Sequence, residues 1–402
     1  MAQAARRLAW PSGEVEQAEK QARVWADGLV ELHQRIGGRF GRVEPRRRAL
    51  AYLRGLLSQV ERKNSWWLAE QAGEVTPDGM QRLLNGSGWD ADGVRDDLRD
   101  YVVEHLGDPD AVLALDETGF VKKGDRSAGV QRQYTGTAGK QENCQVAVFL
   151  AYTAPGGVAL DPGRDLYLPK SWTDDPARCR VAGVPDEVTF KTKPQLGQAM
   201  LERALAARVP FGWVTGDTVY GGDRRLRVWL ESHAIRHVMA VKCTEPLWAM
   251  TEHGPGQVAA QDLIARVPAE QWLGINAGDG SKGKRFYDWS RVPLWRPGWP
   301  ANVGFWLLAR RSLSDPGELA YYVCFAPADT SLVTLVRIAG RRWRVEEAFE
   351  QAKGEVGLDH YQVRQHPAWY RHITLAMVAL AFLAVTRARL PDADDGLGGR
   401  SW

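Results

Sequence analysis

Residues 111–120 read AVLALDETGF, and the rest of the chain is organised around this stretch. The apolar run Ala111–Leu115 is short and is flanked by turn-forming residues, which predicts a fully buried strand. Asp116 and Glu117 follow where this strand is expected to leave the core. Burying a carboxylate is costly unless the group is paired or binds a metal. Asp116 therefore marks either a solvated strand end or a functional site.

The part of the chain before this strand is predicted to be helical. Arg46, Arg47 and Arg48 lie in an arginine-rich run, which forms either a solvated helix face or a surface that contacts DNA phosphates. Residues 65–84 have the spacing of a helix–turn–helix, with Gly73 at the turn, although a generic helical hairpin gives the same pattern.

The part after it alternates between strands and helices, which predicts a mixed α/β core. A second buried strand is expected at 211–216, and it ends in Asp217. A helix is expected at 224–232. Residues 243–329 interrupt this alternation with a tryptophan-rich, mainly β segment, in which 305–309 and 321–325 resemble paired strands.

A helix is predicted over 331–355, and a final apolar helix over 373–390. In the first of these, one stripe of apolar residues at helical spacing faces the core. Arg342, Glu346 and Lys353 lie on a neighbouring polar edge of the same helix. Glu347 points elsewhere, whereas Glu350 shares the polar edge and is a rival to Glu346 on geometry alone.

Asp116, Asp217 and a third carboxylate on the polar edge of this helix, Glu346 or Glu350, together form a set that suits two magnesium ions. Mg²⁺ prefers oxygen ligands and binds substrate phosphates while keeping water. Two ions about 4 Å apart activate the attacking oxygen and stabilise the leaving oxygen in phosphoryl transfer, and Mn²⁺ can substitute. Lys122 and Lys123 follow Asp116 and either line a channel for a phosphate-bearing substrate or solvate loops, and we favour the channel.

Composition is that of an ordinary protein with a packed core, with 402 residues, 44% of them hydrophobic, and a net charge of +3. Only 12 of the 52 basic residues are lysines, and this excess of arginine favours phosphate binding or reflects codon usage. The four cysteines lie far apart, so a cysteine zinc cluster is excluded and a reducing cytoplasm is expected. We recognise no signal peptide, and the longest apolar stretch, 373–385, is too short to span a bilayer, so no membrane partner is expected.

These motifs resemble the DDE-type insertion-sequence transposases, and most closely the group numbered seven-oh-one, which is related to the cut-and-paste transposases with a Tyr-Arg-Glu-Lys signature. The family's two aspartates fall on Asp116 of LALDETGF and Asp217 of VTGDTVYG, and its glutamate falls on Glu346 of RRWRVEEAFEQAK. Arg342, Glu346 and Lys353 match the signature spacing. Ala339 stands at the tyrosine position, and Thr218 replaces the acidic residue that often follows the second aspartate.

The resemblance implies an α/β fold with a ribonuclease H-like catalytic core. The core would comprise 106–242 and 330–390, the second part with a helical C-terminus, separated by a mainly β insertion at 243–329. An all-α DNA-binding domain would occupy 1–105, and a disordered tail 391–402.

The resemblance also implies that the protein is a transposase, which would bind the terminal inverted repeats of its element as double-stranded DNA. The enzyme would cleave strands and join them to target DNA through Asp116, Asp217 and Glu346 with two Mg²⁺ ions, as a homodimer in the paired-end complex. Arg342, Lys353, Lys122, Lys123 and Arg46–Arg48 would contact DNA. We expect a bacterial cytoplasmic protein that associates with the nucleoid when bound to DNA.

Two other classes of function share parts of this pattern. The departures at Ala339 and Thr218 are consistent with a transposase-derived DNA-binding protein that does not catalyse transposition. A glycosidase also uses paired carboxylates, but that function explains neither the Arg–Lys helix edge nor the basic N-terminal region.

Overall fold

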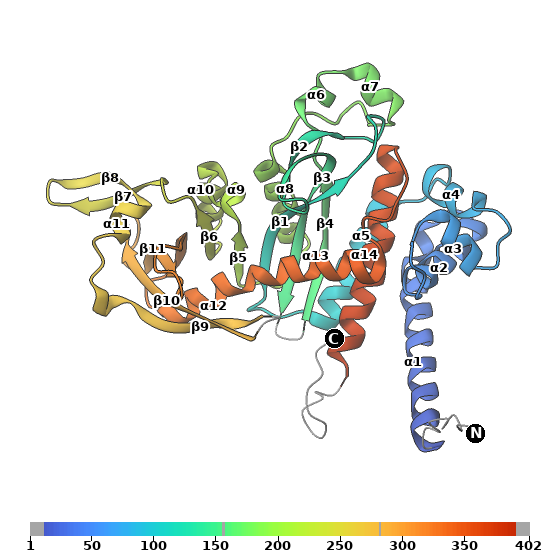
Figure 1. The fold of residues 1–402 in the computed structure, drawn as a ribbon, viewed down its shortest axis with the longest axis horizontal. Coiled ribbons are helices and arrows are strands. Elements are labelled where there is room, and N and C mark those ends of the chain that lie inside the picture. The colour runs from blue at the N-terminus through green and yellow to red at the C-terminus, as the bar shows by residue number, and fades with distance from the viewer. Residues whose placement is uncertain (1–11, 155–156, 281–282, 391–402) are drawn as a thin grey trace, which may run out of the picture.

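The computed structural model describes residues 12–154, 157–280 and 283–390, and Figure 1 shows it as a mixed α/β protein built on one large sheet. Helices from the start of the chain and the last helix lie at one end of this sheet, and the strands of the later β segment lie at the other. The predicted tail at 391–402 lies outside the described residues.

The large sheet has ten strands in the order β2-β3-β1-β5-β6-β12-β11-β10-β9, and β4 pairs with β3 beside this path. The strands are β1 (Val112–Val121), β2 (Gln131–Thr135), β3 (Lys140–Ala154), β4 (Gly157–Leu166), β5 (Trp213–Gly216), β6 (His237–Val241), β9 (Leu273–Gly280), β10 (Gly283–Pro293), β11 (Val303–Arg311) and β12 (Leu319–Pro327). A separate two-stranded sheet consists of β7 (Pro246–Thr251) and β8 (Gly254–Ala259).

Strand β1 lies between two neighbours of opposite direction. It pairs with β3 antiparallel along its whole length, from Val112 to Val121. It pairs with β5 in parallel only as far as Leu115, which lies opposite Gly216. The strand thus continues past Asp116 and Glu117, where we expected it to end, because β3 still supplies hydrogen-bond partners there.

The strands of the later β segment extend the main sheet. Strand β12 pairs antiparallel with β6, so hydrogen bonds join the segment at 243–329 directly to the core strands. The predicted pairing of 305–309 with 321–325 is confirmed, because Phe305 lies opposite Phe325 and Ala309 opposite Tyr321. This segment also contains α11 (Ala260–Ile264) and the short helix η2 (Ala269–Gln271).

All elements described between residues 12 and 106 are helical except for one isolated bridge between Phe40 and Trp89. They are α1 (Ser12–Ile36), η1 (Gly37–Arg39), α2 (Val43–Leu56), α3 (Ser65–Gln71), α4 (Asp78–Asn85) and α5 (Ala91–Leu106). Gly73 adopts φ 74° just after α3, a conformation that glycine adopts at low cost. Met80, Leu83 and Leu84 on α4 are buried, as the spacing predicted.

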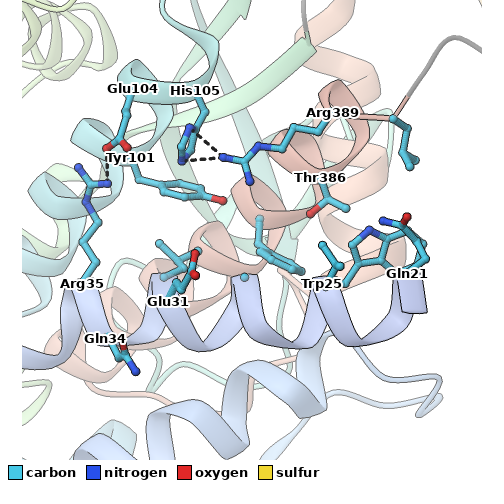
Figure 2. Close-up of a pocket in the computed structure, with 15 residues that line it drawn as sticks. Gln21, Trp25, Glu31, Gln34, Arg35, Tyr101, Glu104, His105, Thr386 and Arg389 are labelled. Carbon is cyan, nitrogen blue, oxygen red and sulfur yellow. Dashed lines mark hydrogen bonds and ion pairs between the residues drawn. The ribbon is translucent and has the colours of Figure 1, made fainter. Parts of the chain in front are cut away.

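These helices share one hydrophobic core with the last helix, α14 (His366–Ala388). The Tyr52 hydroxyl on α2 lies 2.8 Å from Nδ1 of His372 on α14, and both side chains are buried. Figure 2 shows how α1 lies along α5 and α14, with Arg35 pairing with Glu104 and Arg389 with His105. The N-terminal helices are therefore packed onto the rest of the molecule.

Helix α14 begins earlier than the predicted 373, because Pro367 fits the first turn of a helix and does not interrupt it. By length and composition, with mean hydropathy 1.5, it is the one described helix that could cross a membrane. Yet 78% of its most apolar window is buried inside the protein, which is the situation of a core helix.

Five helices lie between β4 and β6 in the sequence. They are α6 (Lys170–Thr173), α7 (Pro176–Val181), α8 (Lys193–Ala206), α9 (Thr218–Gly221) and α10 (Arg224–Ser232), and the last has the bounds that the sequence predicted. Thr192 and Gln195 form a capping box at the start of α8. Asp217 caps α9, and Asp223 caps α10.

The helix predicted over 331–355 is two helices, α12 (Leu332–Arg341) and α13 (Trp343–Val356). At Arg342 the hydrogen bonds tighten, because Arg342 N donates to Ala339 O and Val345 N donates to Arg342 O, each across three residues. The apolar stripe predicted on the second helix is buried, and it comprises Val345, Phe349, Ala352 and Val356. In Figure 1, α12 and α13 follow one another across the sheet, and both contact β1.

Candidate active site

Asp116 and Asp217 lie near each other because their strands are parallel neighbours. Asp116 follows Leu115, the last residue of β1 that pairs with β5, and Asp217 follows Gly216, the last residue of β5. The Asp217 side chain accepts a hydrogen bond of 2.8 Å from the backbone N–H of Val219 and so caps α9. The carboxylates therefore stand at the point where the two strands separate.

The electrostatics of this pair are unfavourable. Burial, together with the negative charge of Asp217, raises the pKa of Asp116 to about 7. Burial and the neighbouring charge of Glu117 raise the pKa of Asp217. Arg342 acts in the opposite direction on both groups, but it does not offset the burial. The two aspartates are thus held close together with too little positive charge around them.

Arg342 links Glu346 to the aspartate pair. The Arg342 guanidinium lies 3.1 Å from the Glu346 carboxylate and 3.9 Å from Oδ2 of Asp116. The Glu346 side chain is 54% exposed. The neighbouring Glu347 pairs with Arg285 at 3.2 Å and with Arg344 at 3.7 Å, so it points away from Asp116 as expected. Glu350 is exposed.

The carboxylate oxygens are of the type that binds a hard cation, but the three predicted ligands are not all close to one another. Asp116 and Asp217 offer partly buried carboxylate oxygens, which are the ligands that Mg²⁺ prefers. Within residues 12–154, 157–280 and 283–390, no three His, Cys, Asp or Glu side chains are grouped closely enough to hold a metal. Arg342 lies between Asp116 and Glu346, at ion-pair distance from both carboxylates.

Two of the lysines predicted to contact DNA are engaged inside the protein. Lys122 Nζ donates to the backbone oxygen of Tyr361 and lies 3.4 Å from the centre of its ring. Burial lowers the pKa of Lys122 to about 8. Lys353 Nζ donates to Thr137 Oγ1 at 3.0 Å, and burial lowers its pKa as well. Lys123 is exposed.

The three consecutive arginines of α2 are in different environments. Arg46 and Arg47 are exposed, and no side-chain ion pair of either is found within the described residues. Arg48 is partly buried and pairs with Glu44 at 2.8 Å and with Glu74 at 3.1 Å, so it joins α2 to the turn between α3 and α4.

The two departures from the family signature are also visible. Ala339 is 1% exposed on α12, where it packs in the core with apolar neighbours. A methyl group there supplies no hydroxyl for a phosphate. Thr218 is the first residue of α9 and is exposed.

Sequence reasoning missed three residues beside this site. Glu117 accepts hydrogen bonds from Lys193 of α8 and Tyr220 of α9, and these partners are 76 and 103 residues away along the chain. The only local signal was the adjacency of Glu117 to Asp116. Nothing in the local pattern indicated Lys193 or Tyr220.

One well-defined pocket lies away from the candidate site. A cavity of about 460 Å³ lies between α1, α5 and α14, and Trp25, Tyr101 and Phe382 contribute aromatic rings to its wall. Figure 2 shows Arg35, Glu104, His105 and Arg389 around it. Neither aspartate of the candidate site lines this cavity.

Comparison with known proteins gives two findings. Residues 35–263 match a model of the DDE superfamily endonucleases, and this match covers more than half of the chain, including Asp116 and Asp217. The chain is similar to a probable transposase for insertion sequence element IS701 from Microchaete diplosiphon, with 23% identity over 322 residues, which are 79% of this chain and 77% of that protein.

The family match and the similarity to a transposase agree with the acidic pair found where two neighbouring parallel strands separate. The chain therefore belongs to the DDE superfamily of endonucleases and is a DDE-type insertion-sequence transposase.

Proposed function

We propose that this protein binds the terminal inverted repeats of an insertion sequence and cleaves and joins DNA strands through Asp116, Asp217 and Glu346. The observation that carries the proposal is the pair of partly buried aspartates with a raised pKa at the point where β1 and β5 separate. Such under-compensated carboxylates destabilise a fold, and they are characteristic of sites that hold a cation or a proton.

The residues have distinct roles in this proposal. Asp116 and Asp217 hold two divalent ions, Mg²⁺ or Mn²⁺, and Glu346 completes the set from α13. The ions supply activation of the attacking oxygen and stabilisation of the leaving oxygen of a phosphodiester. Arg342 binds a phosphate oxygen of the DNA, because its planar guanidinium matches a phosphate in bidentate fashion.

Arg342 must then change partners when substrate arrives. It now contacts both Glu346 and Asp116. A phosphate beside the site offers it a stronger partner, and its departure leaves both carboxylates free to bind cations. Because the Glu346 side chain is 54% exposed, it is free to turn toward Asp116.

The proposal includes a ribonuclease H-like core. What supports it is the run of strands β4-β3-β1-β5-β6, in which β1, β5 and β6 are parallel and β3 is antiparallel, with the acidic residues on the two central neighbours. The carboxyl ends of neighbouring parallel strands are where α/β proteins place ligands.

DNA contact is proposed for the exposed cations. Arg46, Arg47 and Lys123 are free to reach phosphates. Lys122 and Lys353 act indirectly, because they anchor the segments around Tyr361 and Thr137. The helical region 12–106, which we propose to be the DNA-binding part, contributes most of the end recognition.

A homodimer is proposed for the paired-end complex, because each chain offers one set of catalytic carboxylates and excision requires two ends. The cytoplasm, with association to the nucleoid through DNA, is the proposed location. The four cysteines, all free thiols, support a reducing compartment.

The test uses the full chain and a duplex that carries one inverted repeat from the DNA that flanks the gene. We expect strand cleavage at the repeat boundary in Mg²⁺ or Mn²⁺ and none with a chelator. The same length of DNA without the repeat is the control, and the mass of the complex in solution should correspond to two chains and two ends.

The runner-up, a transposase-derived DNA-binding protein without transposition activity, is favoured by Ala339 and Thr218. Specific binding of the repeat with no cleavage in either metal would establish that alternative.

A further inference from the structure

Glu117 lies on the opposite face of β1 from Asp116. Side chains alternate between the two faces of a strand, so two consecutive acidic residues cannot share one face. Asp116 faces Arg342 at the junction of α12 and α13. Glu117 contacts α8 and α9 instead. The sequence pair Asp-Glu therefore has one member on each side of the sheet.

Both carboxylate oxygens of Glu117 are occupied. Oε1 lies 2.6 Å from Lys193 Nζ, and Oε2 accepts a hydrogen bond of 2.8 Å from the Tyr220 hydroxyl. The side chains of Glu117 and Lys193 are only 18% and 22% exposed, and Tyr220 is fully buried. A buried, charge-assisted arrangement of this kind is strong and geometrically specific.

The Tyr220 ring is fixed by close packing. A Cβ added at Gly197 of α8 would lie 3.3 Å from Tyr220 Cε1, and one added at Gly216 would lie 3.1 Å from Tyr220 Cβ. Glycine at both positions lets α8 and β5 approach the ring closely. The hydroxyl is thus presented to Glu117 by a side chain with little freedom to move.

These contacts form a closed connection between the two aspartates. Tyr220 belongs to α9, the short helix that Asp217 caps. Glu117 directly follows Asp116 on β1. The bond from Tyr220 to Glu117 therefore holds α9 against β1 from behind the site, and Lys193 joins α8 to the same point.

We propose that Glu117, Lys193 and Tyr220 form a positioning brace that fixes the separation of Asp116 and Asp217 for cation binding. The inference rests on the proposed function, since it concerns the same pair of aspartates. Glu117 is a positioning residue here, because both of its oxygens already have partners. Groups of this kind outside the ligand set typically contribute tenfold to a hundredfold in metal affinity.

The test is a titration of the full chain with Mn²⁺, followed by electron paramagnetic resonance of the free ion. Tyr220→Phe removes only the hydroxyl and keeps the ring, and Lys193→Met removes the charge. Each is expected to weaken Mn²⁺ binding by about tenfold or more, and Lys193→Arg should restore it. Asp116→Ala should remove the binding altogether.

A matched control is Arg203→Met, which breaks an ion pair of 3.0 Å to Asp165 from the same helix α8. It should leave Mn²⁺ affinity unchanged. Melting curves of all variants check that they fold, and Lys193→Met, with its rescue by Lys193→Arg, provides a second reading if Tyr220→Phe is unstable.

The outcomes separate the brace from the function. If wild-type protein binds Mn²⁺ and cleaves DNA, and Tyr220→Phe and Lys193→Met bind Mn²⁺ equally well, the brace is wrong and the function stands. Loss of all binding in Glu117→Gln with normal binding in Tyr220→Phe would make Glu117 a ligand and also overturn the brace. If wild-type protein neither binds Mn²⁺ nor cleaves, both proposals fail.

Discussion

The aspartates beside β1 and the arginines of α2 are both proposed to act through their charges. The two groups differ in how far they are exposed to solvent. Asp116 is buried beside Asp217, and its pKa is raised to about 7. Arg46 and Arg47 are in solvent, where a charge costs little. A buried charge without sufficient compensation lowers the stability of the fold, so it marks a site more sharply than an exposed one does.

Helix α2 also shows that neighbouring residues of one type differ in role. Arg48 is held by Glu44 and Glu74, whereas Arg46 and Arg47 point into solvent. The same contrast appears on β1, where Glu117 is satisfied by Lys193 and Tyr220 and Asp116 is not. Counting charges in a sequence therefore does not separate structural groups from functional ones.

The largest effect is expected when one of the three proposed catalytic carboxylates is removed. Asp116→Ala, Asp217→Ala and Glu346→Ala should each reduce metal-dependent strand cleavage by more than the roughly hundredfold that an outer-shell change produces. DNA binding, measured on the same repeat duplex, should persist because the N-terminal helices are untouched. Glu350→Ala is the matched control on α13. Normal cleavage by Glu346→Ala together with loss in Glu350→Ala would show that Glu350 is the third carboxylate.

A smaller effect is expected on α2. Replacing both Arg46 and Arg47 by alanine should weaken binding of repeat DNA and lower the salt dependence by about one unit of slope for each phosphate that is no longer neutralised. Arg48→Ala should leave that slope unchanged and lower the melting temperature instead, because it loses its pairs with Glu44 and Glu74. The reverse pattern, with Arg48 setting the salt slope, would contradict the assignment.

A different kind of effect is expected on stability without metal. Because the pKa of Asp116 rises from 3.8 to about 7 on folding, the native state holds its proton over that range while the unfolded state loses it. The carboxylate therefore lowers stability progressively as pH rises from 3.8 to about 7. Asp116→Asn should raise the melting temperature, and the gain should grow across that range and then level off.

Thermal melts in a chelator between pH 4 and pH 8 measure this gain. The control is Glu350→Gln, which changes an exposed carboxylate of α13 and should show no such pH dependence. A gain for Asp116→Asn that does not vary with pH would mean that the carboxylate is not strained by burial.

Much of the catalytic region could be predicted from sequence because its signals are local. An apolar run followed by a carboxylate predicts both β1 and β5, although β1 continues past Asp116, and the helix predicted at 224–232 has the bounds of α10. The same reasoning placed Val345 and Phe349 in the core and Glu346 on a polar edge. These features depend on neighbours within a few residues.

What only the tertiary structure decided depends on partners far away in the chain. Burial of Tyr52 against His372, the engagement of Lys122 with Tyr361 and the contacts of Glu117 each join segments more than 70 residues apart. The spacing of apolar residues and the turn-forming residues indicate which face of a helix or strand is buried. They do not indicate which other element covers that face. The sequence by itself thus determined where the acidic residues stand on their strands, whereas packing between distant segments decided that Asp116 is left under-compensated and that Glu117 is not.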